Sequence, residues 1–113
     1  MRAYAFALVF AVAPPAFAAE PSLNDYPTVA RADYVFACMK TNGETRKALE
    51  QCSCSIDVIA SLLPYDAYVA GETVASMTQD SGVLGRAFKA ATLAKQDLDT
   101  LRRAQAEAEV RCF

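Results

Sequence analysis

Four cysteines constrain the fold of this 113-residue chain more than any other feature of its sequence. They are Cys38, Cys52, Cys54 and Cys112, and all four follow an N-terminal stretch that has the marks of an export signal. In an exported chain of this size, four cysteines indicate two disulfides, because the compartment is oxidising and a small core benefits from covalent links. The sequence therefore predicts a small, disulfide-stapled domain.

The export signal is expected to occupy residues 1–18. A positive start is followed by a nine-residue apolar run, Ala5–Ala13, and then by Ala16–Ala18, the A-x-A form that signal peptidase accepts. Nine helical residues span about 13 Å, well short of the roughly 30 Å hydrocarbon core of a bilayer. We therefore expect cleavage before Ala19, export to the periplasm and no stable membrane insertion.

The rest of the chain is expected to be a single all-α domain, residues 28–113, preceded by an extended lead-in, residues 19–27. Apolar residues recur at helical spacing, and no stretch shows the alternation of a strand. Asn42-Gly43 and Pro64 separate the first three helices. Helices are predicted at about 28–41, 44–63, 64–79, 83–92 and 93–111. The expected fold is a bundle of three to five short helices.

Each predicted helix has an apolar stripe that is expected to face the core. The stripes of the first two helices are Val29, Ala32, Val35, Phe36 and Met39, and Leu49, Cys52, Ile56, Ile59 and Leu63. Those of the third and last are Ala67, Ala70, Val74 and Met77, and Leu98, Leu101, Ala108 and Cys112. On the last helix, the charged ladder Asp99, Arg103, Glu107 and Arg111 is interpreted as a solvated face.

Helix geometry limits how the cysteines can pair. Cys52 and Cys54 point about 200° apart on one helix, so each is expected to reach a different partner. In a hairpin around Asn42-Gly43, one position on the second helix lies directly opposite Cys38. Measured along the helix axis from that position, Cys52 is about 6 Å away and Cys54 about 9 Å away. This favours Cys38–Cys52 with Cys54–Cys112. The alternative, Cys38–Cys54 with Cys52–Cys112, stays open because a looser loop would shift the level.

Composition excludes several classes of function. The chain has no histidine, which removes His-dependent triads, His-ligated metals and CxxCH haem attachment. Its net charge is −2 without a basic cluster, which argues against a nucleic-acid partner. The carboxylates Asp57, Asp66 and Glu72 lack catalytic spacing and are expected to be solvated. Tyr65 and Tyr68 are expected to pack at a helix corner, with a binding rim as the alternative. We predict no catalytic, cofactor-binding or metal-binding residue.

Several segments resemble a group of small exported bacterial proteins with four cysteines. The segments are 33–39 (DYVFACM), 52–60 (CSCSIDVIA), 63–66 (LPYD) and 102–107 (RRAQAE). Members of that group tend to be encoded beside PQQ-dependent (quinoprotein) alcohol or methanol dehydrogenases and their cytochromes c. The resemblance implies a periplasmic location and a link to alcohol oxidation. It brings no catalytic residue with it.

The expected function is that of a non-enzymatic periplasmic accessory or binding protein, with another periplasmic protein as its partner. It would support a quinoprotein alcohol-oxidation system. One alternative is a thiol-dependent copper or redox carrier that uses Cys52 and Cys54, since thiolates select Cu(I) and zinc. Another is a small periplasmic stress chaperone. Titration of free thiols separates the accessory protein from the carrier, and a ligand or partner pull-down separates it from the chaperone.

Overall fold

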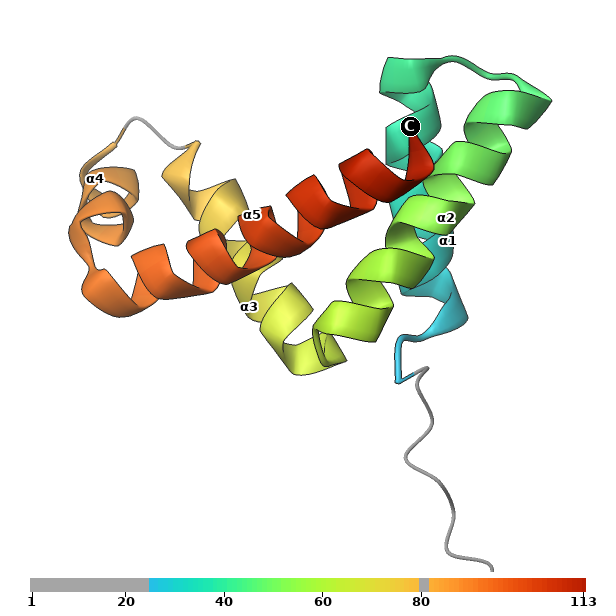
Figure 1. Cartoon of the computed structure of the whole chain (residues 1–113). Helices are drawn as coiled ribbons and strands as arrows, with labels where there is room; N and C mark the ends of the chain where they lie inside the picture. The colour runs from blue at the N-terminus through green and yellow to red at the C-terminus, as the bar shows by residue number, and fades with distance from the viewer. Residues whose placement is uncertain (1–24, 80–81) are drawn as a thin grey trace, which may run out of the picture.

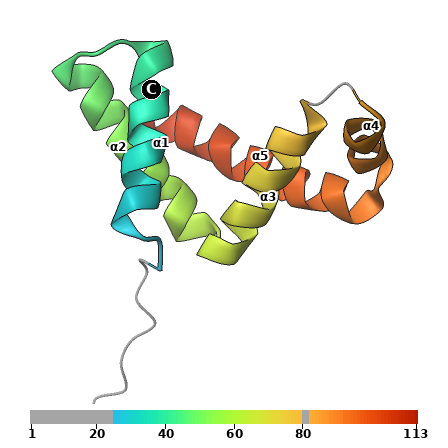
Figure 2. The same cartoon turned by 180° about the vertical axis from the view of Figure 1, so that it is seen from behind.

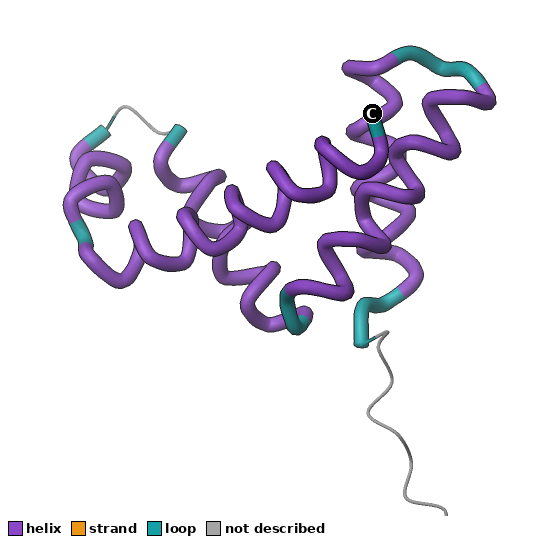
Figure 3. Tube along the Cα trace, in the orientation of Figure 1, coloured by secondary structure: helices purple, strands orange, loops and turns teal. Residues whose placement is uncertain are grey.

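The computed structural model describes residues 25–79 and 82–113 (Figure 1). These residues form five helices joined by short loops, and no strand occurs among them (Figure 3). The helices are α1 (Thr28–Asn42), α2 (Arg46–Leu62), α3 (Tyr65–Thr78), α4 (Val83–Ala90) and α5 (Thr92–Cys112). The prediction of a small, disulfide-stapled all-α bundle is confirmed. The predicted signal peptide, residues 1–18, lies outside the described residues, as does the lead-in up to residue 24.

The helix ends lie close to the turn signals of the sequence. Gly43 follows α1 with φ of 104°, a backbone conformation that suits glycine. Thr45 caps α2, because its side-chain oxygen accepts a hydrogen bond from the backbone of Ala48 at 3.1 Å. Helix α2 therefore begins at Arg46, two residues later than the sequence predicts.

Helix α2 contacts α1 and α5, and it lies with α1 at the end of the molecule opposite α4 (Figures 1 and 2). Helix α1 forms a hairpin with α2, and α5 packs against both α2 and α3. Helix α4 lies at the end of the molecule away from this hairpin, next to the start of α5. The C-terminal residues return to the hairpin. Helix α5 thus connects the two ends of the molecule.

The core follows the apolar stripes of α2 and α5. Ile56 and Ile59 of α2 and Leu101 of α5 are almost completely buried. Around them lie the smaller side chains of Ala60, Ala104 and Ala108, with Leu63 at the corner that leads to α3. Leu49 and Leu98, which the sequence places on the same stripes, are only half-buried. The face assigned to each of these two helices is correct.

Only part of the apolar stripe predicted for α1 faces the core: Val35 packs against it and Met39 is half-buried, but the other three residues are exposed. Val29 and Phe36 are 68% and 65% exposed, Ala32 is exposed, and no residue of α1 is fully buried. The disulfide explains the difference, since Cys38 must turn toward α2. Val29 lies nine residues and Phe36 two residues before Cys38, so both point about 180–200° away from it.

Two residues of the predicted lead-in belong to the helical domain. Tyr26 is buried, and its hydroxyl donates a hydrogen bond of 2.9 Å to the backbone carbonyl of Leu63. The Asp25 carboxylate accepts a hydrogen bond of 2.9 Å from the backbone N–H of Tyr65, at the start of α3. The packed domain therefore begins before residue 28, because its first residues hold the α2–α3 corner.

Helices α3 and α5 approach closely at Gly71. A Cβ atom added there would lie 2.6 Å from the Cβ of Leu101 and 3.1 Å from the carbonyl oxygen of Asp97. Such distances are too short for a side chain, so glycine is what lets the two helices cross here. The crossing lies in the N-terminal half of α5, at Asp97 and Leu101.

Candidate functional site

The four cysteines form two disulfides on opposite sides of α2. Cys38 of α1 is bonded to Cys52, and Cys54 to Cys112 at the end of α5, with Cα–Cα distances of 5.8 and 5.7 Å. This is the pairing that the axial distances in the predicted hairpin favour. No free cysteine is left in the chain. Because the two α2 cysteines point in different directions, α2 is held to α1 on one side and to α5 on the other.

A cleft of about 360 Å³ opens beside the Cys38–Cys52 bond. Four helices and the C-terminal residue contribute to its lining. The lining residues are Tyr34, Ala37, Cys38, Thr41, Asn42, Ser55, Tyr68, Glu72, Gln105, Glu109 and Phe113. We call this space the acidic cleft, because two of these side chains are carboxylates and none is a lysine or an arginine.

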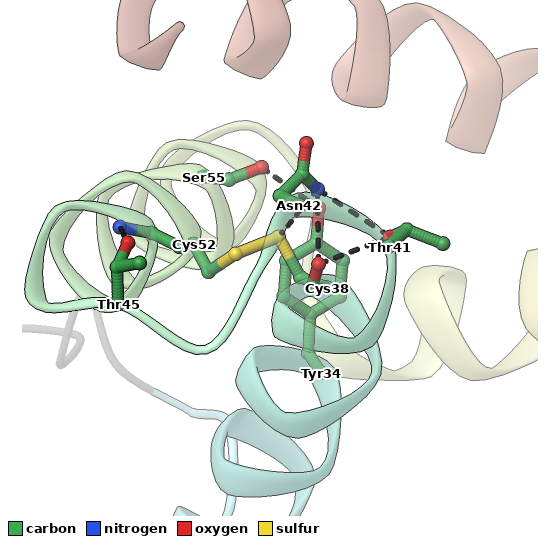
Figure 4. Close-up of a disulfide and its surroundings, with 8 residues drawn as sticks. Tyr34, Cys38, Thr41, Asn42, Thr45, Cys52 and Ser55 are labelled. Atoms are coloured by element: carbon green, nitrogen blue, oxygen red, sulfur yellow. Dashed lines mark hydrogen bonds between the residues drawn. A yellow bond between two sulfur atoms is a disulfide. The ribbon is translucent and has the colours of Figure 1, made fainter.

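One wall of the acidic cleft is a small polar network on α1 and α2 (Figure 4). The hydroxyls of Tyr34 and Ser55 are hydrogen-bonded to each other at 2.7 Å. The side chains of Thr41 and Asn42 donate to the backbone carbonyl of Cys38 at 3.0 and 2.9 Å. These bonds tie the end of α1 and the disulfide into one rigid wall.

The charge of the cleft comes from two other helices. Glu72 lies on α3 and Glu109 on α5, and both line the cleft. Partial burial raises the pKa of Glu72 above its usual value of 4.5, while the positive charge of Arg102 acts in the other direction. Burial also raises the pKa of the Tyr68 hydroxyl, with a further contribution from Glu72. Glu72 is nevertheless exposed at the surface, so its carboxyl group is accessible from solvent.

The chemistry of the acidic cleft is suited to binding. The Ser55 hydroxyl bonds to another hydroxyl, and not to an imidazole or a carboxylate that could accept its proton. The carboxylates and hydroxyls that line it can accept hydrogen bonds from a cationic group, such as an ammonium or a guanidinium. Among the described residues, no three His, Cys, Asp or Glu side chains gather closely enough to hold a metal ion.

The carboxylates considered in the sequence have different surroundings. Asp57 forms an ion pair with Arg31 between α2 and α1. Asp66 is exposed in the first turn of α3. Glu72 is exposed, as expected, and it also lines the acidic cleft. In the charged ladder of α5, Glu107 and Arg111 form an ion pair at 2.8 Å on the exposed face.

The tyrosines at the α2–α3 corner form an aromatic cluster around Tyr26. The ring centroids of Tyr65 and Tyr68 lie 5.1 and 5.2 Å from that of Tyr26. The guanidinium of Arg31 lies 5.6 Å from the same ring, over its face. Burial raises the pKa of Tyr26 to about 12, with a contribution from Asp25. The corner is therefore a packed element, and Tyr68 also lines the acidic cleft.

Sequence reasoning missed Tyr34, Ser55 and Glu109 as members of a site. A usable signal exists in their spacing from the cysteines. Tyr34 precedes Cys38 by four residues, Ser55 follows Cys52 by three and Glu109 precedes Cys112 by three. Residues three or four apart share a helix face. Once the disulfides are assigned, these side chains are expected beside them.

Comparisons with known proteins found no match among protein-family models, curated proteins or solved structures. Within the part of the chain that the structure describes, no helix combines the length and the apolar character needed to cross a bilayer. The two disulfides are compatible with a periplasmic or extracellular protein, since such bonds persist in oxidising compartments.

Proposed function

We propose that this chain is a non-enzymatic accessory protein of the periplasm, exported through a cleaved signal peptide. It binds a partner protein by holding a lysine or arginine side chain in the acidic cleft. The observation that carries this proposal is the pair Glu72 and Glu109, which line one cleft without a lysine or arginine among its lining residues. A cation from a partner would supply the charge that the cleft lacks.

The rigidity of the cleft supports a binding role. Two disulfides and the hydrogen bond between Tyr34 and Ser55 hold α1, α2 and the end of α5 together, so little backbone freedom in these helices remains to be lost on binding. Its volume of about 360 Å³ lies within the range of ligand pockets. Both properties favour recognition of one protruding side chain over contact with a flat surface.

The partner we propose is a component of a quinoprotein alcohol-oxidation system, either the PQQ-dependent dehydrogenase or its cytochrome c. This choice comes from the resemblance seen in the sequence. Partner binding as proposed here involves no free thiol, because all four cysteines are paired in two disulfides. A copper or redox carrier would need Cys52 and Cys54 in reduced form, and alkylation of the protein as isolated from the periplasm measures this directly.

The proposal is tested by capture from a periplasmic extract with three immobilised forms of the mature protein. These are the wild type, the cleft variant Glu72→Gln/Glu109→Gln, and the control Asp33→Asn/Asp99→Asn. The control removes two exposed carboxylates outside the cleft. We expect the wild type and the control to retain the dehydrogenase or its cytochrome c, and the cleft variant to retain at least about tenfold less. Equal retention by all three forms would contradict the role of the cleft.

A further inference from the structure

The end of α1 carries the only Asn-Gly dipeptide of the chain, Asn42-Gly43. An asparagine side chain is lost as ammonia when the backbone nitrogen of the next residue attacks its Cγ atom. A following glycine favours this attack, because it has no Cβ atom and its backbone rotates freely. The chain's other asparagine, Asn24, is followed by the larger Asp25. Asn42 is therefore the asparagine that the sequence predisposes to deamidation.

The dipeptide is accessible to water at the end of a helix. Asn42 is the last residue of α1, and Gly43 follows it with φ of 104°. Both residues are exposed, and a Cβ atom added at Gly43 would meet nothing within 4 Å beyond its neighbours in the chain. Water can therefore reach the reacting groups and the product of the attack.

Hydrogen bonds in the folded protein hold both of the groups that would react. The backbone N–H of Gly43 donates to the carbonyl of Met39 at 2.9 Å. The side-chain nitrogen of Asn42 donates to the carbonyl of Cys38 at 2.9 Å and lies 3.6 Å from the Cys38 sulfur (Figure 4). The attack requires these bonds to break, so it proceeds through local opening of the last turn of α1.

The disulfide between Cys38 and Cys52 opposes this opening. Cys38 is the residue to which the Asn42 side chain is hydrogen-bonded, and its disulfide fixes the same turn of α1 to α2. The second disulfide, Cys54–Cys112, joins α2 to α5 and does not involve α1. The two disulfides should therefore affect the opening of this turn differently.

We propose that Asn42 is a site of spontaneous deamidation, and that the Cys38–Cys52 disulfide controls its rate. The backbone nitrogen of Gly43 forms a bond to the Asn42 Cγ atom, and the Cγ–Nδ2 bond breaks. The proton that the Gly43 nitrogen loses is balanced by the proton that the leaving ammonia gains. Water then opens the cyclic imide at one of its two carbonyl groups, which gives aspartate or isoaspartate. The reaction consumes only water.

Deamidation changes the acidic cleft, because Asn42 is one of its lining residues. Conversion adds a third carboxylate to those of Glu72 and Glu109. The new carboxylate cannot donate to the carbonyl of Cys38, and it lies at the C-terminal end of α1, where the helix dipole disfavours negative charge. The reaction itself needs no partner in the cleft, so this proposal and the proposed function can fail independently.

Peptide mass spectrometry after incubation in mildly alkaline buffer measures the conversion of Asn42 in the mature protein. Two hydrogen bonds must open before the attack, and each corresponds to about fivefold in an equilibrium constant, so the folded wild type should react at least about 25-fold more slowly than the reduced chain in urea. The variant Cys38→Ser/Cys52→Ser, kept folded, should react at least about fivefold faster than the wild type. Both isoaspartate and aspartate should appear at position 42.

Two controls separate local opening from global unfolding. Cys54→Ser/Cys112→Ser removes the disulfide that does not involve α1, and Tyr26→Phe removes a hydrogen bond near the other end of α1 while keeping both disulfides. Both should react like the wild type at temperatures where circular dichroism shows them folded. Hydrogen exchange of the Gly43 amide measures the same opening without the reaction, and it should be faster only in the Cys38→Ser/Cys52→Ser variant.

Four results would overturn the proposal. Asn42 could stay unchanged in the unfolded chain, or it could react as fast in the folded wild type as in the unfolded chain. The folded Cys38→Ser/Cys52→Ser variant could react no faster than the wild type, or Tyr26→Phe could react as fast as that variant. Aspartate without isoaspartate would show direct hydrolysis of the side chain and would also exclude attack by Gly43.

Discussion

At the scale of single residues, Tyr26 contributes to the core although the sequence places it in the lead-in. Its ring is buried, and its hydroxyl satisfies the carbonyl of Leu63 at the end of α2. The variant Tyr26→Phe keeps the ring but leaves that carbonyl without its partner, so we expect it to lower the free energy of unfolding by about 1 kcal/mol. Thermal melts should show a decrease in Tm of roughly 4–8 °C. The half-buried Tyr65 is a useful control, since its hydroxyl has no comparable buried bond and Tyr65→Phe should change Tm less.

Glu72 should give a stability effect that depends on pH. Its pKa is raised in the folded protein, so above 4.5 the unfolded chain ionises more readily and the folded state is penalised. The variant Glu72→Gln removes this penalty. We expect it to melt at a higher temperature than the wild type near pH 7, and the gain to disappear as the pH falls below about 4.5. Thermal melts across this range measure the difference. A gain that is the same at every pH would contradict the assigned cause.

At the scale of helices, the crossing of α3 and α5 depends on Gly71. Alanine is a better helix former than glycine by roughly 0.5–1 kcal/mol, so Gly71→Ala would stabilise an isolated α3. In the folded protein its Cβ would collide with Leu101 and force the helices apart. Overpacking of this kind costs about 1–3 kcal/mol, and we expect net destabilisation in urea unfolding. A stabilised variant would show that the helices cross at a larger distance.

The orientation of α1 has a measurable consequence. Val29 lies on the exposed face of α1, whereas Val74 of α3 is buried. We expect Val29→Ala to change the free energy of unfolding by less than about 0.5 kcal/mol, and the matched change Val74→Ala to lower it by about 2 kcal/mol. Urea unfolding of the two variants compares them. A large loss at Val29 would mean that the face predicted by the sequence is the one that packs.

At the scale of the whole molecule, the two disulfides are expected to contribute unequally. Cys54–Cys112 joins residues separated by 58 positions, and Cys38–Cys52 joins residues separated by 14. In the chain-entropy description, these loops correspond to about 4 and about 3 kcal/mol. Paired replacement by serine, Cys54→Ser/Cys112→Ser or Cys38→Ser/Cys52→Ser, avoids free thiols. Urea unfolding should show the larger loss for the first pair, with helicity partly retained in both.

Much of the helical organisation could be predicted from the sequence, because it depends on local interactions. Apolar spacing and the turn residues Gly43 and Pro64 indicate where helices begin and end. The geometry of one helix also shows that Cys52 and Cys54 must have different partners, which places α2 between two neighbours. The buried faces of α2 and α5 can also be predicted, because on each of these helices the apolar stripe includes a cysteine that forms a disulfide.

The remaining features were decided by the tertiary structure. Val29 and Phe36 lie on the side of α1 opposite Cys38, and the covalent bond to α2 turns Cys38 inward, which leaves Phe36 exposed. Tyr26 and Gly71 matter through contacts with residues 37 and 30 positions away, beyond the reach of helix periodicity. The acidic cleft has the same origin. Its carboxylates come from α3 and α5. They line the same cleft because Gly71 lets α3 cross α5 and because the Cys54–Cys112 bond anchors the end of α5 to α2.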